Sequence, residues 1–171
     1  MNPRSARAYV QLGELYFCST PDSTIDIGAA EQAYHRALEL HNEETRPLLR
    51  LAEIALIRGE LSDARESLDA VVGSNYRNAD AYFLKGYLLW KSGASREAAV
   101  HYARAAQYAE AAAVTASEHA SDGVPAVTLE ARDECPTFPL PSLEQSHQSS
   151  SRNAYQSFAD TLTYIRDRFD R

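Results

Sequence analysis

The sequence predicts an all-α protein in which helical hairpins stack in series and are followed by a linker and a final amphipathic helix. Small and large apolar residues recur in one pattern three times, at intervals of about 34 residues, which is a period typical of helical repeats. Four of the seven prolines fall between residues 125 and 141 and predict an interruption there. The last segment then carries apolar residues at spacings of three and four, the periodicity of an α-helix.

The third copy of the pattern, within residues 79–105, is the clearest. An aromatic residue is followed by glycine and a large apolar residue; a second glycine marks a turn, and alanine, tyrosine and alanine follow. These places are held by Tyr82, Gly86, Leu89, Gly93, Ala98, Tyr102 and Ala105. Small residues let two helices approach closely and bulky ones fill the space beside them. The pattern therefore predicts a packed pair of helices.

Two earlier copies occupy the same register with some substitutions. The second copy has Leu48, Leu51, Ala52, Ala55, Gly59, Ala64, Leu68 and Val71 in these places. The first has Tyr9, Leu12, Gly13 and Tyr16, followed by Ala30, Tyr34 and Ala37. Its second helix is displaced by the turn-rich stretch at residues 19–24, where an insertion is tolerated. The arrangement resembles the tetratricopeptide repeat (TPR) family over about residues 4–107, which implies a TPR-type α-α superhelix of three hairpins.

Turn residues predict where the helices begin and end. Gly59 and Gly93 follow the first helix of their pairs, where a left-handed residue is needed. Ser62 and Ser95 stand where we expect helix N-caps. The last repeat helix has no breaker after residue 105, so we expect it to continue to about residue 118. The prediction is a repeat domain at 1–118, an extended linker at 119–150 and an amphipathic helix at 151–171.

The apolar stripe of the final helix predicts that this helix binds a surface. Its members are Tyr155, Phe158, Leu162, Ile165 and Phe169. A single helix of this kind is marginal in water, whereas burying five large side chains contributes about 10 kcal/mol before costs. Three surfaces remain open at this point: the exposed end of the third repeat, the protein's own groove, or another chain.

The resemblance to the TPR family implies a concave face lined by the first helix of each repeat. Carried over to this sequence, the lining residues are Val10, Gln11, Glu14 and Phe17, then Leu49, Arg50, Glu53 and Leu56, then Phe83, Leu84, Tyr87 and Trp90. The lining becomes more apolar toward the third repeat, which favours an apolar or helical partner segment. An alternative is that Phe83 and Trp90 pack against a neighbouring helix.

The groove does not match the family's carboxylate-binding variant. Only Arg50 could donate to a terminal carboxylate there, and Glu14 and Asp80 would repel it. The formal net charge of -7 also disfavours nucleic-acid and anionic-lipid partners. A protein or peptide is the partner that we expect.

We expect no catalytic residue, cofactor or metal. The five histidines show no metal-ligand spacing, and no nucleotide-binding or nucleophile motif occurs. Cys18 and Cys135 are distant in sequence and are interpreted as separate thiols in a reducing compartment. The N-terminal residues lack the apolar core of a secretory signal, and no apolar run is long enough to span a bilayer. These features predict a cytoplasmic location.

The function that the sequence predicts is therefore protein binding. The chain is expected to act as a scaffold, an adaptor or a subunit of a larger assembly, through its groove, its final helix or both. The alternative is a small TPR chaperone that holds client or secreted proteins.

Overall fold

The computed structural model describes the backbone of residues 5–17, 25–42, 44–120 and 151–169, and the side chains of these residues except 116–120 and 168–169. The described residues form seven α-helices and no strand, which confirms the all-α prediction. The helices are α1 (Ala6–Phe17), α2 (Ile27–Leu40), α3 (Thr45–Arg58), α4 (Leu61–Ser74), α5 (Ala79–Lys91), α6 (Ser95–Ala120) and α7 (Ser151–Phe169). The predicted insertion at 19–24, both cysteines and nearly all of the predicted linker lie outside the described residues.

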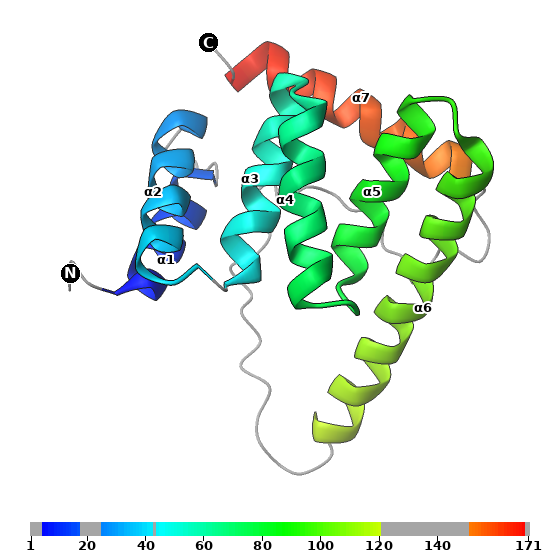
Figure 1. Ribbon diagram of the computed structural model, residues 1–171, viewed down its shortest axis with the longest axis horizontal. Helices are drawn as coiled ribbons and strands as arrows, with labels where there is room; N and C mark the ends of the chain where they lie inside the picture. The colour runs from blue at the N-terminus through cyan, green and yellow to red at the C-terminus, as the bar shows by residue number, and fades with distance from the viewer. Residues whose placement is uncertain (1–4, 18–24, 43, 121–150, 170–171) are drawn as a thin grey trace.

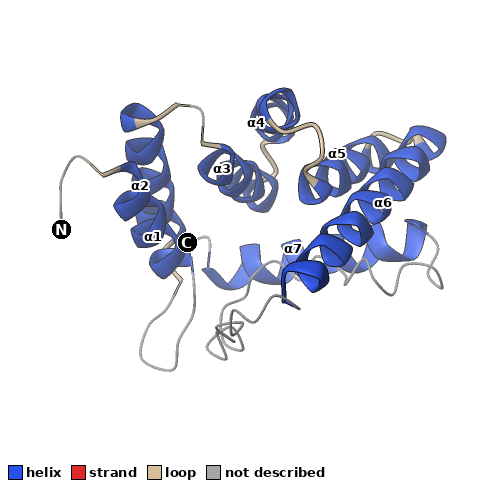
Figure 2. Cartoon of the chain, turned by 90° about the horizontal axis from the view of Figure 1, so that it is seen from below, coloured by secondary structure: helices blue, strands red, loops and turns tan. Residues whose placement is uncertain are grey.

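The first six helices form three hairpins that follow one another in chain order. Figure 1 shows α1–α2, α3–α4 and α5–α6 side by side, with α6 continuing past the start of α5. Helix α7 runs across this array and contacts α3, α5 and α6. In Figure 2, α3 and α5 lie between α4 and α7. The three hairpins, the long last repeat helix and the final helix thus match the expected order of elements.

Two glycines connect the helices within the second and third hairpins. Gly59 and Gly93 have φ values of 82° and 87°, the left-handed conformation predicted for them. The N–H of Glu60 donates to Ala55 O over 2.8 Å, and the N–H of Ala94 donates to Leu89 O over 2.9 Å. These are the hydrogen bonds of a Schellman motif, which satisfies carbonyls at a helix end.

The serine caps predicted at the next helices are wrong. Helix α4 begins at Leu61 with Glu60 as its cap residue, and α6 begins at Ser95 itself. In the second and third hairpins, the two residues that close the Schellman turn, Gly59–Glu60 and Gly93–Ala94, directly precede the next helix. No further residue therefore remains between the turn and the helix to act as a separate cap. Side-chain caps occur instead at Asp26 and Asn78, which each accept a backbone N–H over 2.8 Å.

The alternation of small and large residues packs the hairpins as the pattern predicts. A Cβ placed on Gly13 of α1 would lie 2.5 Å from the ring of Tyr34 of α2. The two helices therefore approach more closely than a side chain at residue 13 would allow. Ala30, Ala52 and Ala64 are fully buried in the same way. Most buried apolar residues of the hairpins and of α7 belong to one apolar core.

Candidate functional site

The apolar stripe of α7 is buried against the repeats. Tyr155, Phe158, Leu162 and Ile165 are at most 4% exposed and belong to the same core as the residues of α3 and α5. The fifth member of the predicted stripe, Phe169, has a side chain outside the described residues. Of the surfaces that the sequence left open, α7 therefore lies on the protein's own concave face.

An aromatic cluster forms the contact between α7 and the third repeat. The ring of Phe158 lies nearly perpendicular to those of Phe83 and Tyr87, with centroids 5.3 Å and 5.0 Å away. The ring of Tyr155 lies 5.7 Å from Tyr102 and 6.3 Å from Trp90. The edge-to-face pairs in this cluster, those of Phe158 and the Tyr102–Tyr155 pair, each stabilise by about 0.5–1.5 kcal/mol beyond the area they bury. Phe83, Tyr87 and Trp90, predicted to line the groove, are thus brought together under α7.

The hydroxyl of Tyr155 reaches into a notch between α5 and α6. It donates to the carbonyl of Ala98 over 3.1 Å. A Cβ on Gly86 would lie 1.9 Å from this oxygen, so the notch exists because residue 86 has no side chain. Burial raises the pKa of the Tyr155 hydroxyl, which keeps it a donor. Gly86 and Ala98 were assigned only to hairpin packing by the sequence pattern, which contained no sign of this second role.

A polar contact anchors the opposite end of α7. The guanidinium of Arg166 donates to the carbonyl of Ile57, in the last turn of α3. Carbonyls in this turn have no partner within the helix and lie at the negative end of its dipole, so a cation there is favourable. Arg166 directly follows the last described apolar residue of the stripe, and in the sequence it is indistinguishable from the other charged residues of the polar face.

The other half of the groove is polar and internally paired. Arg50 donates to Glu14 over 3.1 Å and to Glu53 over 2.8 Å. Burial lowers the pKa of Arg50, but the two carboxylates outweigh this effect and raise it above its usual value. The one predicted cation of the groove is therefore already engaged by the protein's own acids.

The carboxyl of Glu53 has lost most of its hydration. Its side chain is 1% exposed, and this burial raises its pKa to about 7, even though Arg50 acts in the opposite direction. Asp80 and Glu14 raise it further by repulsion. Burial likewise raises the pKa of Asp80. A carboxyl without access to solvent is unavailable for contact with a partner in this conformation.

The remaining predicted lining residues fall into two groups. Leu49, Leu56 and Leu84 are buried in the repeat core together with Phe17. Val10 and Gln11 instead border an open hollow of about 570 Å³ between α1 and the start of α3. The structure thus divides the predicted groove into a part covered by α7, a buried polar centre and an uncovered end.

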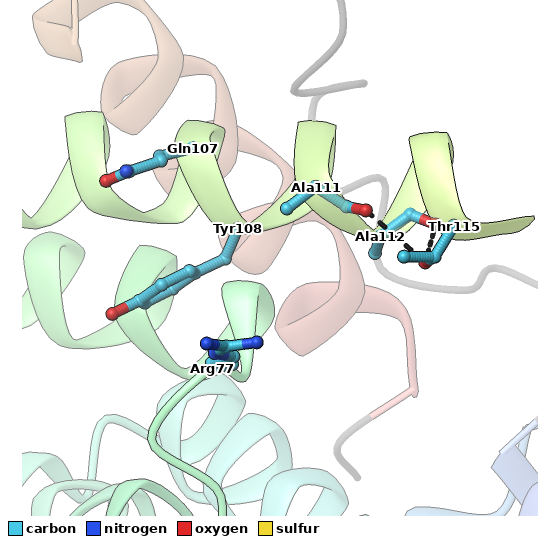
Figure 3. A pocket seen from close by; sticks show the side chains of 6 residues that line it. All are labelled: Arg77, Gln107, Tyr108, Ala111, Ala112 and Thr115. Atoms are coloured by element: carbon cyan, nitrogen blue, oxygen red, sulfur yellow. Dashed lines mark hydrogen bonds between the residues drawn. The ribbon is translucent and has the colours of Figure 1, made fainter.

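A second hollow, of about 390 Å³, runs along the extension of α6 beyond α5. Figure 3 shows it between Arg77, from the α4–α5 connection, and the α6 residues Tyr108 and Thr115. The Thr115 hydroxyl is directed back to the carbonyls of Ala111 and Ala112. Nothing in this lining supplies a nucleophile with a base beside it.

Metal-ligating side chains do not gather in the part of the chain that the structure describes. There, no three His, Cys, Asp or Glu side chains are arranged to hold a metal ion. None of the described helices has the length and hydrophobicity required to cross a membrane. In comparisons of the sequence, no protein-family model and no curated protein matches this chain.

Proposed function

We propose that this chain is a protein-interaction module of the TPR type, an adaptor or assembly subunit whose concave groove binds an amphipathic helix of a partner. One observation supports this most: the groove already holds a helix, and that helix is this chain's own α7. The TPR assignment rests on the three repeats of the sequence and on the three hairpins they produce.

The contact has the chemistry of a helix-in-groove complex. Anchor residues at intervals of three and four enter an apolar surface, which is a common mode of peptide recognition. The four described anchors contribute about 6–12 kcal/mol before the cost of ordering the helix, an upper figure because the unfolded chain already buries some of this area. None of these contacts depends on α7 belonging to the same chain, so a helix from another protein can make them.

The nature of the occupant favours this function over the chaperone alternative. Chaperones of this family are expected to hold extended client segments, whereas the bound segment here is a helix of 19 residues. The surface complementary to it is a row of aromatic rings spaced to receive one helical face. A helical partner is therefore the better match.

Capture of partners by groove variants tests the proposal. The full-length chain carrying Phe158→Glu, which weakens α7 docking, serves as bait in cells that express the protein. Trp90→Ala is then added in the groove, with Val100→Ala as the control because Val100 is exposed on α6. We expect a partner that is enriched by the bait, retained by the control and reduced about tenfold by Trp90→Ala, the effect of losing a typical anchor of about 1–2 kcal/mol. Equal recovery on all three baits would refute groove binding.

A further inference from the structure

The notch that holds Tyr155 lies at a repeat position that, in the first repeat, is filled by a tyrosine of the same hairpin. In the first repeat, the ring of Tyr34 from α2 covers Gly13 so closely that a Cβ there would lie 2.5 Å from it. Gly86 and Tyr102 hold the matching places in the third repeat. Above Gly86, however, the nearest atoms belong to Tyr155 and His101. The hairpin α5–α6 thus leaves its aromatic place to a residue from outside the hairpin.

The notch discriminates between side chains by shape and by polarity. Its floor is the backbone of Gly86, and its walls include the rings of Phe83 and Tyr102, 5.2 Å and 5.7 Å from that of Tyr155. Its far end offers the carbonyl of Ala98 as an acceptor. A phenylalanine fills nearly the same volume without the hydrogen bond, and an aliphatic side chain leaves the end of the notch empty. A tyrosine satisfies both requirements.

The other anchors fix the register and the direction of the bound helix. Phe158 enters between two rings of α5 three residues after the tyrosine, and Leu162 and Ile165 follow on the same face. Arg166 reaches the end of α3 only if the helix runs from α6 toward α3. A helix inserted in reverse would place neither the tyrosine hydroxyl nor the guanidinium at its acceptor.

We propose, on the basis of the helix-binding function above, that the groove selects partner helices with the pattern Tyr-x-x-Phe-x-x-x-Leu-x-x-Ile-Arg and that α7 is a tethered copy of this ligand. The occupant that replaces α7 is an amphipathic helix of another polypeptide with tyrosine in the first position. Partner binding then requires α7 to leave. If α7 is docked about 99% of the time, the apparent affinity for the partner falls about 100-fold.

Cutting the connection between α6 and α7 tests directly whether a free helix replaces α7 in the groove. A protease site is placed between residues 121 and 150 of the full chain, so that cleavage keeps both pieces present. The probe is a fluorescent synthetic peptide of residues 151–171, and its binding is measured by anisotropy before cleavage and after cleavage with dilution. We expect at least about tenfold tighter binding after cleavage, because an untethered α7 loses its effective concentration, which is in the millimolar range for a flexible link.

Variants of the same peptide test whether the groove selects tyrosine at the first position of the helix. Tyr155→Phe in the peptide should weaken binding about fivefold, the effect of losing one neutral hydrogen bond. Thr163→Val is the matched control, since it removes from the same helix a hydroxyl that donates to the Ala159 carbonyl within α7 itself; it should change affinity less than about twofold.

Each contrary result has a distinct meaning. Equal affinity of the wild-type peptide and the Tyr155→Phe peptide overturns tyrosine selection and leaves helix binding intact. Equal probe affinity before and after cleavage overturns competition by α7. If the cleaved pieces separate during gel filtration and the wild-type peptide still does not bind, both this inference and the proposed helix-binding function fail.

Discussion

The buried carboxyl of Glu53 predicts an unusual dependence of stability on pH. Its pKa of about 7 in the folded protein lies above the ordinary 4.5, so the folded state holds this proton over a range where the unfolded state has released it. Stability therefore falls as pH rises from about 5 to 8, which is the reverse of the usual behaviour of a paired carboxylate. The ionised group remains destabilising above this range.

The magnitude follows from the size of the shift. Each pKa unit corresponds to about 1.4 kcal/mol, so the ionised carboxyl lowers the free energy of unfolding by up to about 3 kcal/mol at pH 8. Glu53→Gln cannot ionise but keeps an oxygen that can accept from Arg50. Relative to the wild type, the variant should gain about 2–3 kcal/mol between pH 5 and pH 8, because the wild type loses stability there.

Urea unfolding followed by far-ultraviolet circular dichroism at several pH values measures this difference. Effects of other groups that titrate in this range are common to both proteins and cancel to first order. The control is Glu39→Gln, which removes a carboxyl whose side chain is 61% exposed and paired with Arg36. A stability difference between wild type and Glu53→Gln that stays constant from pH 5 to pH 8 would refute the argument from burial.

Four further substitutions test the packing. Gly86→Ala should undock α7 and accelerate its amide exchange, because the new Cβ would lie 1.9 Å from Tyr155 Oη; unchanged exchange would contradict the notch. Gly59→Ala should lower the unfolding free energy by about 1 kcal/mol in thermal melts, because its φ of 82° strains alanine. Gly73→Ala, where a Cβ meets nothing, should be neutral or stabilising, and equal effects at both glycines would contradict this. Phe158→Ala should accelerate exchange in α7 but not in α3; equal acceleration in both helices would show that α7 cannot undock alone.

The hairpins could be predicted because their determinants are local and repeated. Gly13 and Tyr34 are separated by one turn-rich stretch, and the same small-to-large pairing recurs in each copy of the pattern. Gly59 and Gly93 were located correctly for the same reason, since a left-handed residue is required at a defined distance from the helix. Only the serine caps failed, because the closing bonds of the turn determine where the next helix begins.

The polar centre of the groove could not be predicted from residue types alone. The resemblance to the TPR family predicts Arg50 and Glu53 on the concave face, and in the structure Arg50 is paired with Glu53 and Glu14. Whether such residues face a partner or each other depends on distances between α1 and α3. The 3.1 Å contact from Arg50 to Glu14 spans 36 residues of sequence. Because of this contact, the Arg50 guanidinium that is paired with Glu53 also has a second partner within the protein.

The location of α7 shows most clearly where sequence reasoning ends. Its stripe predicts that the helix must be buried but is equally compatible with a groove, a repeat end or another chain. The deciding feature is whether a tyrosine of the hairpin covers the glycine opposite it. Tyr34 and Tyr102 have the same place in the pattern, yet the atoms nearest to Gly13 belong to Tyr34, whereas those nearest to Gly86 belong to Tyr155 and His101. The same motif thus gives one glycine that is covered within its hairpin and one that is covered from α7, and the residue pattern does not specify which of the two forms.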